Sequence, residues 1–227
     1  MTSALVAGML LLALCAHLLH LARRSRARAA DESAADLASL SKVLDGVRGA
    51  ASGTAGVSTF VGTWRGHQVQ VRTIVDTLAT RKLPALWLSV TLIGDTSMPA
   101  VFDMMMRPGS ATTFSNFDFL PHGVPAPASY PEGAVIRTDS AGVSLPLHVI
   151  ARHLDGFGDP NAKELLVTRN GVRLVWLLAE ADRARYGVFR QAAFTRGAID
   201  PQLVASLLAR ASALRAAINR AALELAA

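Results

Sequence analysis

Three side chains of this sequence could carry out acid–base chemistry, two carboxylates and one imidazole. Asp95 follows an apolar run, Asp103 precedes three consecutive Met residues, and His153 comes five residues after His148. Carboxyl groups with different pKa values, or a carboxylate beside a histidine, are what hydrolases use as acid and base. One hypothesis is therefore a membrane-bound, hydrolase-like enzyme that uses Asp95, Asp103 and His153.

The positions of these residues argue against that hypothesis. Asp95 and Asp103 fall at predicted strand ends or loops, where Asp commonly caps turns. His148 and His153 are five residues apart and so do not share a helical face, which disfavours a metal site. The Gly-rich stretch Gly49–Gly56 lacks the Gly-Lys-Ser/Thr ending of a phosphate-binding loop. We predict no catalytic residue, no cofactor and no metal ion.

The charge of the chain is concentrated near its beginning. The formal net charge is +6, but from Ala29 onward 19 basic residues face 17 acidic ones. A nucleic-acid-binding domain would carry a basic stripe on its folded part, and this body is nearly neutral. The excess comes from four arginines directly after the first apolar run, Arg23, Arg24, Arg26 and Arg28.

That apolar run predicts a membrane anchor over residues 1–28, Arg-rich flank included. Ala4–Ala22 holds no formal charge over 19 residues, and a helix of that length spans roughly 28 Å, the thickness of a bilayer core. A cleaved signal peptide would carry basic residues before the run and a small-x-small site after it. Because positive residues stay in the cytoplasm, we predict a single-pass inner-membrane protein with its N-terminus outside and its body cytoplasmic. The alternative is a periplasmic body that binds the cell envelope.

The anchor also carries a stripe of small and polar residues. Ala13, Ala16, His17 and His20 share one helical face, and small residues let helices approach closely in lipid. This pattern predicts contact with a membrane-protein partner. The segment Ala13–Leu19 also resembles the Ala-x-x-x-His pattern of light-harvesting polypeptides, which implies a pigment or haem at His17 or His20 as an alternative.

A helix and a linker are predicted over residues 29–56. Ser33 and Asp36 form a plausible capping box, and an apolar stripe runs through Leu37, Leu40, Leu44 and Val47 up to Arg48. The small residues of Gly49–Gly56 would then form a hinge.

The remaining residues, 57–227, predict a soluble α+β domain with a mostly antiparallel sheet. Alternation indicates a hairpin of Ser58–Trp64 with Gln68–Val75, and a strand at Leu86–Gly94. Asn170-Gly171 predicts a type I′ turn between two later strands. Helices at Leu145–Leu154 and Asp200–Leu225 would cover one face of the sheet.

The C-terminal helix carries apolar residues at alternating spacings of three and four. This seam favours packing on the chain's own sheet. The alternative is self-association or partner docking, with contacts through Val204, Leu207, Leu214 and Ile218.

The order of these parts is similar to that of a known group of proteins. T-W-R-G-x-x-V-x-V begins at Thr63, Gly94-Asp95 and Phe102-Asp103 follow, and an Asn-Gly hairpin precedes the last helix. Over Ser58–Leu225 the chain resembles uncharacterised membrane-anchored bacterial α+β proteins. The resemblance implies the anchor and the fold class, and it implies no activity. We therefore expect a non-catalytic accessory or scaffold subunit of a membrane protein complex.

Overall fold

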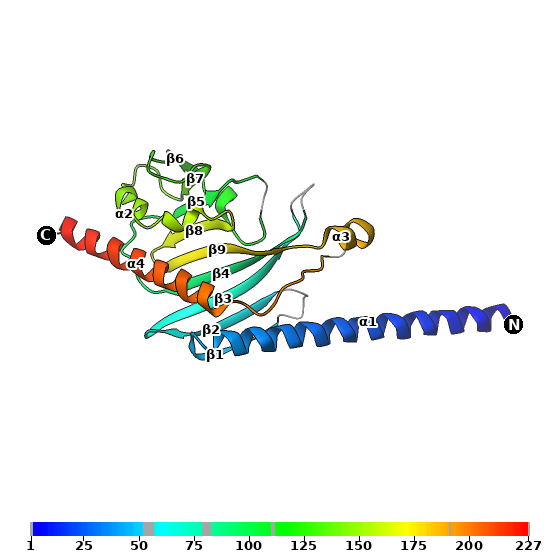
Figure 1. Ribbon diagram of the computed structural model, residues 1–227. Coiled ribbons are helices and arrows are strands. Elements are labelled where there is room, and N and C mark those ends of the chain that lie inside the picture. The colour runs from blue at the N-terminus through cyan, green and yellow to red at the C-terminus, as the bar shows by residue number, and fades with distance from the viewer. Residues whose placement is uncertain (1, 52–56, 79–82, 110–111, 191, 227) are drawn as a thin grey trace.

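One long helix leads into an antiparallel sheet that makes up most of the body (Figure 1). The computed structural model describes residues 2–51, 57–78, 83–109, 112–190 and 192–226, with the side chains of 2–7, 50–51, 189 and 226 left out. Its helices are α1 (Thr2–Leu40), α2 (Leu147–Ala151), α3 (Arg183–Phe189) and α4 (Pro201–Ala226), with short 3-10 turns η1 (Phe117–Phe119) and η2 (Asp155–Gly158). Its strands are β1 (Asp45–Ala51), β2 (Ser58–Trp64), β3 (His67–Asp76), β4 (Ala85–Ile93), β5 (Phe102–Met106), β6 (His122–Val124), β7 (Ala134–Thr138), β8 (Ala162–Thr168) and β9 (Gly171–Glu180).

Within the described ranges these strands form one nine-stranded sheet in the order β1-β2-β3-β4-β9-β8-β5-β7-β6. Each neighbouring pair is antiparallel. The predicted first hairpin is confirmed, and Arg65 and Gly66 make its turn with φ of 50° and 79°, as a type I′ turn requires. The predicted α+β fold with a large antiparallel sheet and a long C-terminal helix is therefore confirmed.

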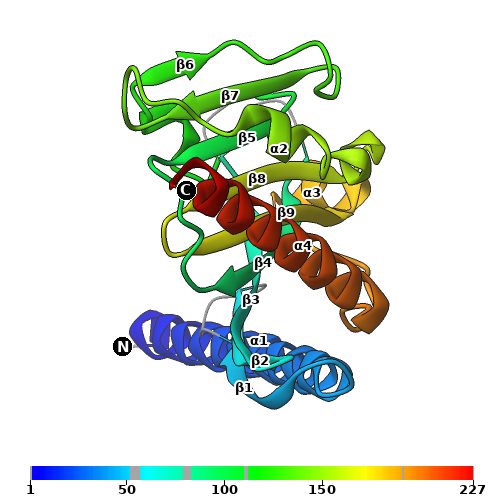
Figure 2. The same cartoon turned by 90° about the vertical axis from the view of Figure 1, so that its left-hand side faces the viewer.

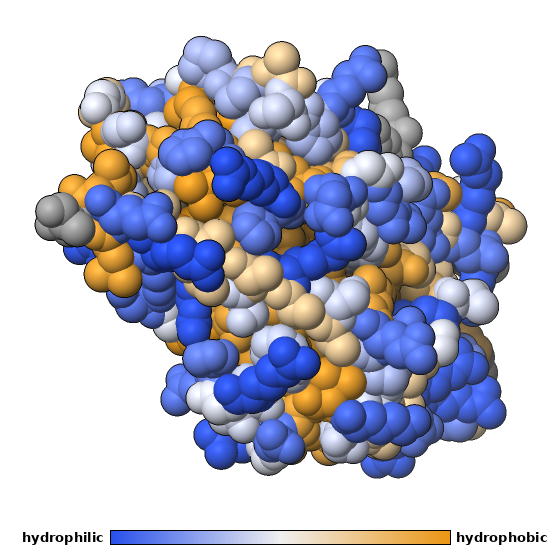
Figure 3. All heavy atoms as spheres, turned by 60° about the vertical axis from the view of Figure 1, so that its left-hand side comes forward, coloured by the Kyte–Doolittle hydropathy of each residue, from blue (hydrophilic) through white to orange (hydrophobic). Residues whose placement is uncertain are grey.

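Helices α2 and α4 cover one face of the sheet, and α4 crosses it diagonally (Figure 2). The core on this face takes alternate residues of the strands, as pleating dictates, among them Phe60, Val71, Leu88, Val90, Met104, Leu165 and Leu174. Asp200 caps α4 by accepting a hydrogen bond from the Gln202 N–H at 2.9 Å. Hydrophilic side chains cover most of the outer side of this layer, with apolar ones gathered in small patches between them (Figure 3).

The start of the chain differs from the prediction between residues 29 and 56. Helix α1 runs without a break from Thr2 to Leu40, so Ser33 and Asp36 lie inside it and form no capping box. The expected helix is present as far as Leu40 and is wrong beyond it. The expected hinge is wrong over Gly49–Ala51, because Asp45–Ala51 is strand β1, paired with β2. A Cβ at Gly49 would collide with the carbonyl oxygen of Thr59, so the glycine allows this close pairing. Residues 52–56 of the expected hinge lie outside the described residues.

The predicted turn at Asn170-Gly171 also differs from the structure. Gly171 belongs to β9 and pairs with Thr168, so the turn consists of Arg169 and Asn170 and is not type I′. A Cβ at Gly171 would meet the carbonyl oxygen of Leu92. The absence of a side chain at Gly171 therefore allows β9 to pair closely with β4.

A buried ion pair joins the end of α1 to the start of α4. The two terminal nitrogens of Arg196, Nη1 and Nη2, each donate to one oxygen of the Asp36 carboxylate at 2.8 Å. The Ile199 N–H donates to the same carboxylate at 2.9 Å. The Ser39 hydroxyl donates to the Ile199 carbonyl at 2.7 Å. Hydrogen bonding to Asp36 raises the pKa of Arg196, against the effect of its burial. Leu40 and Leu44, from the predicted apolar stripe, enter the core beside this joint.

The first prediction concerns this joint. Replacing Asp36 by alanine leaves a mostly buried guanidinium without its partner, and the free energy of unfolding should fall by roughly 3–5 kcal/mol. Urea denaturation of the full chain in a mild neutral detergent measures the change. Asp155→Ala, which breaks the exposed Arg210–Asp155 pair, is the matched control and should cost less than about 1 kcal/mol. Equal losses in the two variants would contradict a structural role for the joint.

Candidate functional site

The three residues proposed for acid–base chemistry lie in separate places. Asp95 is exposed after β4, where its carbonyl oxygen accepts a hydrogen bond from Asn219 of α4 at 3.2 Å. Asp103 is 2% exposed and is the second residue of β5, close to the start of that strand. His153 lines a small cavity beneath α4 together with Leu165. Asp103 pairs with Leu166, the next residue of β8, so its side chain lies on the opposite face of the sheet. The structure therefore does not bring Asp95, Asp103 and His153 to a common point.

Asp103 instead belongs to a buried ionisable cluster with Glu164 of β8 and Arg173 of β9. Glu164 lies opposite Met105, two residues from Asp103 on the same face of the sheet. Arg173 binds the Glu164 Oε2 atom through two nitrogens, at 2.9 and 3.1 Å. Among the described residues, Asp103 Oδ1 and Glu164 Oε1 are buried without a hydrogen-bond partner. Two carboxyl groups thus face one cation.

This imbalance changes the protonation of the cluster. Burial, followed by repulsion from Glu164, raises the pKa of Asp103 to about 8, although Arg173 and the Ser115 hydroxyl oppose the rise. Burial also raises the pKa of Glu164, again against the effect of Arg173. Asp103 is therefore mostly protonated at neutral pH, while Glu164 forms the ion pair with Arg173. A protonated carboxyl can donate a hydrogen bond.

Sequence reasoning missed Glu164 and Arg173, because their pairing depends on which two residues form the turn between β8 and β9. In the β8–β9 hairpin, Leu166 pairs with Arg173 and Glu164 with Val175. Glu164 and Arg173 are therefore diagonal neighbours on one face. The predicted Asn170-Gly171 turn would instead have paired Arg173 with Thr168 and left Glu164 four residues away along the strand.

A cavity of about 940 Å³ opens on the same face of the sheet as the cluster, between the ends of β3, β4, β8 and β9 and helix α3. Trp87 and Leu177, which pair across β4 and β9, form its apolar floor. Trp87 is half-buried and packs on Phe114 with a ring separation of 5.2 Å. Leu78, Leu83 and Tyr186 add to the apolar lining. The other two tryptophans, Trp64 and Trp176, are core residues.

Cations outnumber carboxylates around this cavity. Its lining includes Arg107, Lys163, Arg183 and Arg190, against Asp76 and Glu180. Asp76 is 5% exposed and accepts a hydrogen bond from the Leu78 N–H at 3.1 Å, so its carboxylate is engaged with its own strand end. The excess of positive charge favours an anionic ligand group.

The two charged side chains at the β5 end also hold the wall together. Arg107 donates to the carbonyl oxygens of Pro160 at 2.9 Å and Ala162 at 3.4 Å. Lys163 donates to the carbonyl oxygens of Met106 at 2.7 Å and Arg107 at 3.0 Å. Arg183 and Arg190 of the α3 region are exposed, and Arg190 lies over the Tyr186 ring at 5.7 Å. A ligand would therefore meet exposed charges on the α3 side and hydrogen-bonded ones at the β5 end.

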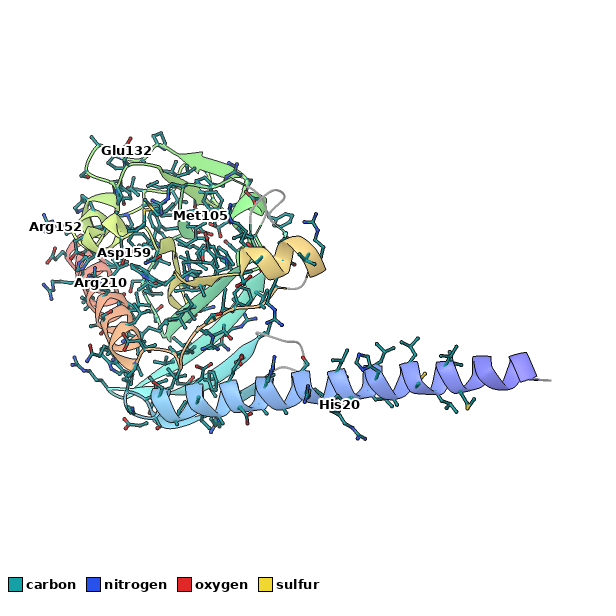
Figure 4. All side chains as sticks on the ribbon, turned by 45° about the vertical axis from the view of Figure 1, so that its right-hand side comes forward. His20, Met105, Glu132, Arg152, Asp159 and Arg210 are labelled. Atoms are coloured by element: carbon teal, nitrogen blue, oxygen red, sulfur yellow. The ribbon has the colours of Figure 1, made fainter. Side chains whose placement is uncertain are left out.

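The residues predicted to contact a partner fall into two groups. Ala13, Ala16, His17 and His20 are exposed on the part of α1 that projects from the body, where Figure 4 labels His20. Val204, Leu207, Leu214 and Ile218 are at most 2% exposed and pack on the sheet. In this structure the chain's own strands fill the seam, which is the arrangement that the spacing of apolar residues favoured. Leu223 and Leu225, near the end of α4, remain exposed.

Two kinds of feature have no counterpart in the described part of the chain. It contains no group of three or more His, Cys, Asp or Glu residues arranged to hold a metal ion. Over the same residues, no helix combines the length and the apolar character needed to cross a bilayer.

Comparison with known proteins adds little to this description. No family model matches the chain, and no curated protein matches it. Among solved structures it is similar to the mycobacterial trehalose monomycolate transport factor A, with a TM-score of 0.32 and 13% identity over 60% of this chain and 68% of that chain. A likeness at this level carries no argument about function.

The second prediction concerns pH. Asp103 keeps its proton up to about pH 8 in the folded chain, whereas its ordinary value is 3.8. Between these values the folded state binds more protons than the unfolded state, so stability falls as pH rises. Asp103→Asn mimics the protonated form and should lose less stability from pH 5 to pH 8 than the native chain, by about 2 kcal/mol or more. Denaturation midpoints across this range measure the difference.

Asp95→Asn is the control for this experiment. It removes an exposed carboxylate outside the cluster and should leave the pH dependence of the native chain unchanged. If Asp103→Asn and the native chain showed parallel pH profiles, the raised pKa of Asp103 would be contradicted.

Proposed function

We propose that this chain is a membrane-anchored accessory subunit that contacts another membrane protein through its first helix. The observation that carries the proposal is the exposed apolar part of α1. All described side chains from Gly8 to Arg28 are exposed, among them Met9, Leu10, Leu11, Leu12, Leu14, Leu18, Leu19 and Leu21, each 48–71% exposed. Burying a large aliphatic side chain is worth roughly 1.5–3 kcal/mol, so this stretch requires an apolar environment that the body does not supply.

A bilayer is the environment that fits this stretch best. The proposed span, Ala4–Ala22, starts in the part of α1 whose side chains lie outside the description, and its described part continues without charge to Ala22. The run Arg23–Arg28 then supplies the charges that stay on the cytoplasmic side. Contact with the body begins only at the next turns, near Ser33 and Asp36. We therefore propose a single-pass inner-membrane protein with a cytoplasmic body.

An accessory role is favoured over a hydrolase by the arrangement of the side chains. Asp95, Asp103 and His153 are not gathered in the described structure, and Asp103 is enclosed within the sheet. Acid–base catalysis requires its groups within hydrogen-bond reach of one substrate. The stripe of Ala13, Ala16, His17 and His20 instead offers a close-packing helical face.

The third prediction concerns topology. A reporter that is active only in the periplasm, fused after Ala227, should remain inactive, because the Arg-rich flank holds the body in the cytoplasm. The same reporter fused before Met1 should be active. Activity at the C-terminal position would overturn the proposed orientation.

The fourth prediction concerns the helix face. Replacing Ala13, Ala16, His17 and His20 together by leucine should preserve membrane localisation but reduce recovery of the co-purifying partner several-fold in a mild-detergent pull-down. Cys15→Leu/Ala22→Leu, on the opposite side of the helix, is the control and should leave recovery unchanged. Undiminished recovery with the first variant would contradict partner contact through this face and leave α1 as a membrane anchor only.

A further inference from the structure

The cavity beside α3 lies at the end of the body that α1 points toward with its N-terminal half. In both Figure 1 and Figure 4, α3 and the β3–β4 end of the sheet lie on this side, while α2 and the end of α4 lie on the other. Figure 4 shows α3 reaching along the direction of α1 toward the level of His20. With Ala4–Ala22 in a bilayer, this end of the body faces the lipid headgroups.

The side chains at this end have the character of a membrane-facing surface. Val188 of α3 is 74% exposed and Leu78, at the cavity rim, is 55% exposed. Arg183, Arg185 and Arg190 are exposed beside them. Apolar side chains interspersed with arginines are typical of segments that lie in the interface of an anionic membrane.

The cavity is positively charged at its rim and apolar at its floor. Arg183 and Arg190 stand at the α3 side, and Arg107 and Lys163 at the β5 end. Between them lie the half-buried Trp87 ring and Leu177. A volume of about 940 Å³ exceeds what a bare phosphate would fill and is typical of sites for ligands with both polar and apolar parts.

We propose that this cavity binds the headgroup and upper acyl chain of an anionic phospholipid from the membrane that holds the anchor. The phosphate would lie between the arginines of the α3 side and the cations of the β5 end, and guanidinium groups suit phosphate because they donate in a planar fork. The glycerol and first methylenes would lie on Trp87 and Leu177. The inference rests on the proposed function in one respect, because the anchor supplies the lipid.

The test uses the full chain in a neutral detergent and a phosphatidylglycerol with brominated acyl chains, which quench nearby tryptophans. Trp87 lines the cavity, whereas Trp64 and Trp176 are each 7% exposed in the core. Saturable quenching is expected with brominated phosphatidylglycerol, at a concentration about tenfold or more below that needed for brominated phosphatidylcholine. Trp87→Phe should abolish the quenching, which separates the cavity from lipid held by the Arg23–Arg28 run.

Charge variants complete the experiment. Arg183→Gln/Arg190→Gln should bring the two lipids to nearly equal quenching. Arg152→Gln/Arg220→Gln makes the same change in charge on exposed residues of the α2 and α4 side, where Figure 4 labels Arg152, and it should keep the preference. A structural collapse would be visible as a red-shifted emission of Trp64 and Trp176, and a folded variant that keeps the preference would overturn the proposal.

Three results would refute the lipid site. They are equal quenching of the native chain by the two lipids, no quenching by either, and reversal of the quenching by millimolar inorganic phosphate, which would assign the cavity to free phosphate. Because the lipid is added to detergent-solubilised protein, the measurement is valid whichever way the anchor is oriented. Failure of the topology prediction and failure of this one are therefore distinguishable.

Discussion

The orientation of the whole body depends on the buried Asp36 carboxylate. It receives two hydrogen bonds from Arg196 and one from the Ile199 N–H, and so it joins α1 to the segment that starts α4. Because α4 in turn packs across β4 and β9, the position of the sheet relative to α1 is set by this joint and by Leu40 and Leu44. A carboxylate with no exposed surface tolerates this environment only while all its partners stay in place.

The two faces of the sheet divide the roles of the fold. The face under α2 and α4 is filled by aliphatic and aromatic residues, and it accounts for most of the core. The other face carries the Asp103–Glu164–Arg173 cluster, a smaller apolar cluster around Phe114 and Phe117, and the cavity beside α3. The buried charged groups thus lie on the face that loops cover, and the helices α2 and α4 pack on the apolar face.

Sequence periodicity predicted the parts of this fold that depend on local pattern. Alternation located β2, β3 and β4, and the spacing of three and four located α4. Periodicity failed where contact with a residue far away in the sequence determines the structure. The Gly49–Ala51 backbone is a strand because β2 pairs with it, and Asp36 is an ion-pair residue because Arg196 lies 160 positions later. The cavity was not predictable, since its lining comes from four strands and α3. The Glu164–Arg173 pair was not predictable either, because the predicted Asn170-Gly171 turn gives a register in which Arg173 lies opposite Thr168.

The unbroken course of α1 has a mechanical consequence. A helix of 39 residues with no proline or kink is a stiff rod on the scale of a domain. Its last turns are fixed in the body by the Asp36 joint, so the rod and the sheet move together. Under the proposed topology, a partner that tilts or rotates the first half of α1 would swing the cavity end of the body toward or away from the lipid surface. The chain is in this sense a lever, in which a small change of angle at one end becomes a displacement at the other.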